Sequence, residues 1–184
     1  MQQVKGTILR ARLSFVEEHF GKDAVKQVLD SLPPDDRKTL ALVVILRSYP
    51  FELGRRLDDA IVTVLGGGRS DFFERLGEAS AQKNLTTVHR SFLTKGDAHG
   101  FLSKAPTIYS FYYETGRREY ERVSDREGVL TTFDAETFSA PDCLTVIGWH
   151  RKALEMCGVQ GVAVREETCR AGGARVCRYR FTWS

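Results

Sequence analysis

Two runs of alternating side chains near the carboxyl end constrain the fold of this chain most strongly. They occupy residues 161–166 and 175–181, and Gly172 and Gly173 lie between them. Alternation with a period of two predicts strands, and a glycine-containing break between two such runs predicts a turn. The chain therefore ends in a predicted β-hairpin.

The rest of the chain is predicted to be mainly helical, with two more strands before the last helix. Residues 7–113 carry apolar side chains at spacings of three and four, interrupted at glycines and prolines. Residues 118–123 and 128–133 are predicted strands, and a helix capped by Ser139 with Pro141 in its first turn follows them. This order predicts an α+β fold, with a helical N-terminal half packed on a four-stranded antiparallel sheet at the C-terminal end (ββαββ order).

Length and composition predict one globular domain covering residues 1–184. The chain is 42% hydrophobic and 28% charged, and its net charge of +3 comes without a stripe of lysines and arginines. This charge pattern argues against a nucleic-acid-binding protein. No run of 18 apolar residues and no secretory signal core occur, so we expect a cytoplasmic protein without a membrane span.

One short apolar run, residues 40–46, has a conformation that its periodicity does not decide. It is too short to span a membrane. We expect it to be buried, either as a strand or as a helix.

The predicted hairpin brings possible metal ligands together. Cys169 and Cys177 lie on the two sides of its turn, Glu166 precedes the first of them, and Cys143 lies at the start of the last helix. We call these four residues the cysteine cluster. Zinc accepts a tetrahedron of thiolates with a carboxylate. The odd separation of Glu166 and Cys169 would point them to opposite faces of a regular strand, so a shared metal site needs Cys169 to lie in the turn. Free buried thiols, or a Cys169–Cys177 disulfide, are the alternatives.

A ligand pocket between the helices and the sheet is a second candidate site. Ligand pockets are mostly apolar with a few polar groups. The aromatic side chains that could line one, with His89 as a polar contact, are Phe92, Tyr109, Phe111, Tyr113 and Trp149. Ordinary core packing is the alternative explanation for each of these aromatic residues.

The spacing Glu166-x-x-Cys169-x-x-x-Gly173-x-x-x-Cys177 resembles that of the V4R (4-vinyl reductase) domain. Cys143 is similar in position to the additional cysteine of phenol-sensing V4R domains of bacterial transcription activators. The resemblance implies that this Cys, Glu, Cys and Cys set binds a structural zinc ion.

Residues 5–8 (Lys-Gly-Thr-Ile) and 15–21 also resemble the related haem–nitric-oxide-binding domains and a family of uncharacterised myxobacterial proteins. All belong to one ligand-binding superfamily, which includes the Bet3-like vesicle-tethering subunits. Haem-binding members use a helix histidine as the iron ligand and a Tyr-x-Ser-x-Arg motif for the haem carboxylates. Residues 109–113 do not reproduce that motif, and His89 is the one histidine considered as an iron ligand. The resemblance therefore favours zinc as the cofactor, with haem unfavoured.

These observations predict a non-enzymatic sensory module. It would bind an apolar, aromatic or acyl molecule, carry a structural zinc site, and signal through a protein partner. The alternative is a ligand-free adaptor that acts by protein–protein interaction, as a homodimer for example. An enzyme is suggested only by the reductase in the domain's name, and no cofactor fingerprint accompanies it.

Overall fold

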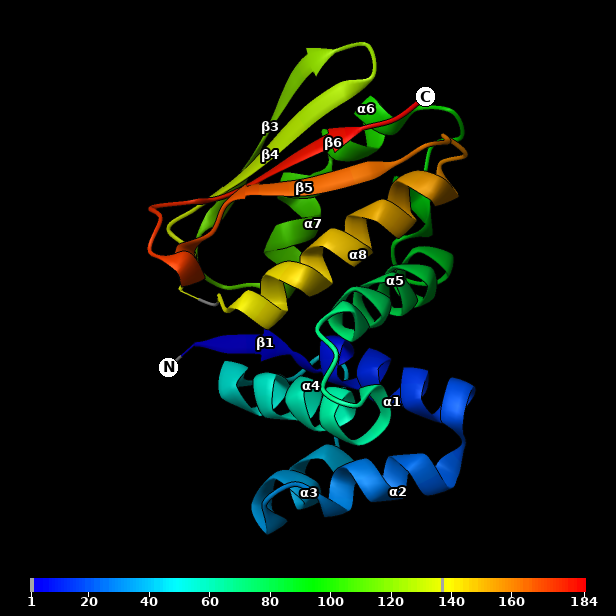
Figure 1. Cartoon of the computed structure of the whole chain (residues 1–184), viewed down its shortest axis with the longest axis vertical. Helices are drawn as coiled ribbons and strands as arrows, with labels where there is room; N and C mark the ends of the chain where they lie inside the picture. Colours follow the sequence, from blue (N-terminus) through cyan, green and yellow to red (C-terminus); the bar gives the residue numbers. More distant parts are fainter. Residues whose placement is uncertain (1, 137) are drawn as a thin grey trace.

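The computed structural model describes residues 2–136 and 138–184, so positions 1 and 137 of the predicted domain lie outside the described residues. The chain is built in layers, with a sheet at one end and two pairs of helices at the other (Figure 1). A further pair, α5 (Asp71–Thr86) and α8 (Ala140–Met156), runs between them. The predicted α+β fold, with a helical N-terminal half and a C-terminal antiparallel sheet, is confirmed.

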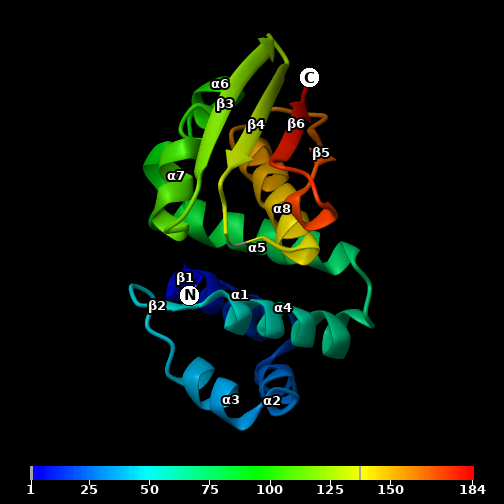
Figure 2. The same ribbon diagram turned by 90° about the vertical axis from the view of Figure 1, so that its left-hand side faces the viewer.

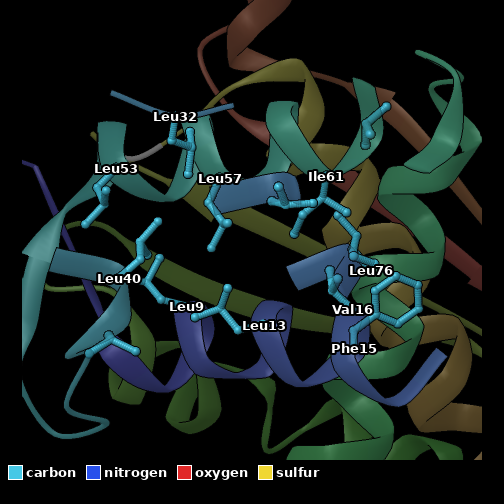
Figure 3. Close-up of a cluster of buried hydrophobic side chains, with 14 of the residues drawn as sticks. Leu9, Leu13, Phe15, Val16, Leu32, Leu40, Leu53, Leu57, Ile61 and Leu76 are labelled. Atoms are coloured by element: carbon cyan, nitrogen blue, oxygen red, sulfur yellow. The ribbon is translucent and has the colours of Figure 1, made fainter. Parts of the chain in front are cut away.

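The helical layer at one end of the molecule, which we call the helical half, is formed by about the first third of the chain. Its elements are β1 (Gln3–Lys5), α1 (Gly6–Phe20), α2 (Lys22–Asp30), α3 (Pro34–Ala41), β2 (Ser48–Pro50) and α4 (Phe51–Gly66). Apolar side chains spaced along one face of each helix meet in a core that includes Leu9, Leu57 and Ile61 (Figure 3). The short strands β1 and β2 pair antiparallel beside α1, which the sequence did not predict.

The middle of the chain connects the two halves. It contains α5 (Asp71–Thr86), a 3₁₀ turn η1 (Arg90–Phe92), α6 (Ala98–Leu102) and α7 (Ala105–Tyr112). The apolar spacing of residues 85–93 does not produce a separate helix, because α5 ends at Thr86 and His89 lies in the connection before η1. Both α6 and α7 lie along the β3 side of the sheet (Figure 2).

The sheet contains β3 (Arg117–Ser124), β4 (Glu127–Phe133), β5 (Ala163–Thr168) and β6 (Cys177–Thr182), in the order β3-β4-β6-β5. All three pairings are antiparallel. Helix α8 (Ala140–Met156) packs under it, and the Ser139 hydroxyl accepts a hydrogen bond from the Asp142 N–H. The predicted cap and the proline in the first turn of this helix are confirmed.

Residues 40–46 correct a sequence expectation. Helix α3 ends at Ala41, and the chain then turns instead of forming a buried strand or helix. Val43 is buried, whereas Leu42 and Leu46 are 79% and 84% exposed. In the described part of the chain, no helix has both the length and the apolar character needed to cross a membrane.

Candidate functional site

A cavity lies where the helical half meets α5, α7 and α8. It contains about 870 Å³ of space between atoms, including its opening to solvent. Ile8 of α1, Ile108 of α7 and Val146 of α8 contribute to its apolar wall. We call this space the central cavity. Its position between layers means that a bound molecule would contact both halves of the domain.

The residues predicted from sequence to bind a ligand fall into two groups. Tyr109, Tyr113 and Trp149 line the central cavity. His89, Phe92 and Phe111 lie outside it and pack on one another. The His89 ring is 5.3 Å from that of Phe111 and 5.5 Å from that of Phe92, and burial lowers the His89 pKa.

Charged side chains on the cavity wall were not anticipated from the sequence. Arg12 of α1 donates to Asp58 of α4 at 2.8 Å and also to the Ser80 hydroxyl. Burial raises the pKa of Asp58 because desolvation outweighs the attraction of Arg12. Burial also raises the pKa of Asp142 to about 7, and Asp58 adds to the rise. These charged residues lie on helices whose apolar periodicity predicts core packing. The sequence pattern alone therefore did not identify them as cavity residues.

His150 and Arg118 form a second polar contact on the same wall. The His150 Nδ1 lies 2.9 Å from the carbonyl oxygen of Val146, so this nitrogen carries the hydrogen and leaves Nε2 as an acceptor. Arg118 approaches Nε2 at 3.4 Å and donates to the Thr132 hydroxyl. Burial, with the nearby Arg118 charge, lowers the pKa of His150 to about 3. The His150 imidazole is therefore neutral. Arg118 is 91% buried, and no carboxylate of the described residues lies within ion-pair distance of its guanidinium.

Two buried polar atoms at the cavity lack partners. Within residues 2–136 and 138–184, the Tyr112 hydroxyl and the Arg55 Nε make no hydrogen bond. Both residues line the cavity. An unpaired buried polar group costs about 1–3 kcal/mol. A molecule with hydrogen-bonding groups at the cavity edge would satisfy them.

The cysteine cluster forms a separate site at the edge of the sheet. Cys143 lies in the first turn of α8, and its Sγ is 3.3 Å from Cys169 Sγ and 3.9 Å from Cys177 Sγ. One ligand atom from each of these cysteines and from Glu166 lies within 4.8 Å of the others. The β5–β6 register shifts after Glu166, and Cys169 follows the end of β5. This irregularity places Cys169 off the regular strand, as the odd spacing required.

The cluster has unmet hydrogen-bonding and charge requirements. All four cysteines of the described chain are free thiols, so the alternative Cys169–Cys177 disulfide is not formed. The hydrogen bond from Cys143 lowers the pKa of Cys177 to about 6, and the Arg170 N–H also donates to Cys177 Sγ. The buried Glu166 Oε1 has no hydrogen-bond partner among the described residues. A cation would satisfy this oxygen.

Comparison with protein families gives a match over most of the helical half and the connecting helices. The sequence profile described as Haem-NO-binding matches residues 5–118, more than half of the chain. The chain belongs to the haem-NO-binding family. The family is one of small-molecule sensor domains, in agreement with the predicted sensory module. The V4R resemblance concerns the C-terminal cysteine spacing, which lies outside the matched residues.

Solved structures of haem-NO-binding (H-NOX) proteins share the fold. An unliganded Fe(II) H-NOX mutant from K. algicida has a TM-score of 0.71 at 13% identity, covering 98% of this chain and 96% of that chain. An S. oneidensis H-NOX protein in the Fe(II)NO state has a TM-score of 0.72 at 16% identity, covering 98% and 99%. A structure on haem distortion in the H-NOX family gives 0.73 at 14%, covering 98% and 95%. No protein of curated function matches the sequence.

These findings correct the predicted cofactor. The prediction of zinc as the cofactor, with haem unfavoured, is wrong, because the matched family is haem-binding and the similar structures are of H-NOX proteins described by their haem or iron. The prediction considered His89 as the iron ligand, but His89 lies on no helix and outside the central cavity. His150 was not among the predicted site residues, because no partner for it is visible in the sequence.

Proposed function

We propose that this haem-NO-binding domain is a non-enzymatic sensor whose ligand or cofactor occupies the central cavity and which signals through a protein partner. The observation that carries the proposal is the neutral His150 imidazole on the cavity wall, beside an arginine without a carboxylate partner among the described residues. Because the cavity is bounded by both layers, its occupancy can alter their packing. A partner protein in contact with either layer could detect that change.

The donor set of the cavity fits haem, the group that the family implies. His150 would hold the iron through Nε2 once Arg118, which donates to this nitrogen in the structure, turns away from it. The hydrogen bond from Nδ1 to the Val146 carbonyl fixes the required tautomer. Arg118 and Arg55 would face the haem carboxylates. Tyr109, Tyr113 and Trp149, predicted from sequence as ligand contacts, would pack on the apolar parts. Bound haem would supply an iron position for a diatomic gas.

Haem reconstitution tests this proposal. We expect the purified chain to take up one haem per protein and to give a histidine-type Soret band, and His150→Ala to weaken uptake strongly. His19→Ala is the matched control, because His19 contacts Phe15 on its own helix, with Nδ1 against the Phe15 carbonyl, and does not line the cavity. Equal uptake by the wild type and His150→Ala would reject His150 as the ligand.

An apolar or acyl molecule is the second occupant that the cavity wall favours. Ile8, Ile108 and Val146 supply apolar surface, and the Tyr112 hydroxyl supplies an unused polar group. Thermal unfolding with haem and with apolar carboxylic acids separates the two occupants. If neither raises the melting temperature, the ligand-free adaptor becomes the better explanation.

We also propose that the cysteine cluster binds a thiophilic metal ion with a structural role, separate from the family cofactor. Support comes from the convergence of four ligand atoms and from the unpartnered Glu166 Oε1. Soft metals prefer thiolate ligands. With all four positions supplied by protein, the ion would join the first turn of α8 to the β5–β6 hairpin.

A further inference from the structure

The connection between α3 and β2 exposes a run of apolar side chains. We call residues 42–46 the apolar loop. Leu42 and Leu46 are 79% and 84% exposed, and Val44 and Ile45 are 55% and 47% exposed. Figure 2 shows this connection at the outer edge of the helical half, away from the sheet. Four large apolar side chains exposed within five residues form a concentrated patch of the kind that marks interaction sites.

The loop is held in this exposed conformation by its backbone. The N–H groups of Gly6 and Thr7, at the start of α1, donate to the carbonyls of Arg47 and Ile45 at 2.8 and 3.0 Å. The Tyr49 hydroxyl accepts from the Val44 N–H at 2.8 Å. These bonds anchor the loop on both sides, so its four exposed apolar side chains are carried by an ordered backbone, while Val43 is buried.

Two arginines accompany the apolar side chains. Arg10 donates to the Val43 carbonyl of the loop at 3.2 Å, and Arg47 follows Leu46 directly. Both arginines are exposed, and neither forms an ion pair within the described residues. Arg47 lies 6.0 Å from the Tyr49 ring. The patch therefore combines apolar side chains at its tip with two uncompensated positive charges beside its backbone.

We propose that the apolar loop docks this domain on an anionic lipid surface. Apolar side chains at the tip would enter the region between headgroups and acyl chains, while Arg10 and Arg47 would remain at the level of the lipid phosphates. An exposed apolar loop accompanied by two unpaired arginines suits shallow insertion into an anionic bilayer. The inference is independent of the molecule that occupies the central cavity.

Vesicle flotation with the full chain tests the proposal. We expect the protein to float with phosphatidylcholine vesicles that contain phosphatidylserine, and to float less with pure phosphatidylcholine or at high salt. The double variant Leu42→Glu/Leu46→Glu should reduce binding by about tenfold or more. The matched control is Val88→Glu/Val123→Glu, which makes the same charge change at two exposed valines outside the loop.

Three outcomes would overturn the proposal. The wild type could fail to bind anionic vesicles at low salt, or both double variants could lose binding equally. Light scattering could instead show a concentration-dependent dimer that the loop variant abolishes, without vesicle binding by the wild type. That last result would make a second copy of the chain the occupant. Circular dichroism of both variants shows whether they remain folded.

Discussion

Gly77 of α5 and Gly148 of α8 face the backbone of each other's helix. A Cβ atom at Gly77 would overlap the carbonyl oxygen of Thr145, and one at Gly148 would overlap the carbonyl oxygen of Glu74. The absence of side chains at both positions lets the two helices cross closely. Since α5 leads from the helical half and α8 supports the sheet, this crossing joins the two layers (Figure 1).

Alanine at either glycine should destabilise the domain. We expect Gly77→Ala and Gly148→Ala each to lower the free energy of unfolding by about 1–3 kcal/mol, because backbone atoms cannot move aside without separating the helices. Urea unfolding measures the change. Gly172→Ala is the control, since no described atom beyond Gly172 and its two chain neighbours lies within 4 Å of a Cβ placed there. Comparable losses in all three variants would show that the close crossing is not the cause.

Metal binding at the cysteine cluster predicts a spectroscopic signal. We expect cobalt(II) added to the metal-free protein to give thiolate charge-transfer absorption, and Cys169→Ser to weaken it. A metal at about a hundred times its Kd would stabilise the fold by about 2.7 kcal/mol, so chelation should lower the melting temperature. Cys157→Ser tests whether any thiol suffices, because Cys157 is a buried thiol outside the cluster. An unchanged spectrum in Cys169→Ser would contradict the proposed ligand set.

The sheet and its supporting helix could be predicted from the sequence because their signals are local. Alternation in residues 175–181 and the Ser139 cap each depend on neighbouring side chains only. The apolar loop could not be predicted in the same way. Its composition resembles a core segment, and its exposure is decided by bonds to Gly6 and Thr7, which lie far away in the sequence.

The candidate sites were predictable to different degrees. The cysteine cluster is a set of uncommon residues whose spacing in the sequence is enough to predict that they lie close together. The polar wall of the central cavity is different, because Arg118 and His150 come from a strand and a helix separated by 32 positions. Tertiary packing brings the two residues together. The sequence around a single histidine or arginine does not predict such a contact.

Two tyrosines on α7 should respond oppositely to loss of their hydroxyls. Tyr109 donates to the Thr115 carbonyl at 2.8 Å, so Tyr109→Phe should cost about 1 kcal/mol of unfolding free energy. The buried Tyr112 hydroxyl has no partner in the described chain, so Tyr112→Phe should leave stability unchanged or raise it by up to about 1 kcal/mol. Tyr112→Phe should nevertheless weaken binding to the central cavity. A clear loss of stability in Tyr112→Phe would show that its hydroxyl is already satisfied.

His150 should make the domain sensitive to acid. Its pKa falls from 6.5 to about 3 on folding, mainly because of burial, so the unfolded chain binds the proton more readily. The stability associated with a neutral His150 is complete above pH 6.5 and is lost as the pH falls from 6.5 towards 3. At about 1.36 kcal/mol per pH unit, roughly 2–3 kcal/mol should disappear between about pH 6.5 and 4.5.

His150→Asn isolates this contribution, since its amide can still donate near the Val146 carbonyl and does not titrate. Urea unfolding of both proteins across this pH range gives the comparison. Other titrating groups, including Asp58 and Asp142, remain in both proteins, so they largely cancel in the difference between the two curves. We expect the wild type to lose stability faster than the variant as the pH falls. Parallel curves would mean that His150 is not held neutral by the fold, and would also remove the electrostatic basis for placing a metal-ligating imidazole in the cavity.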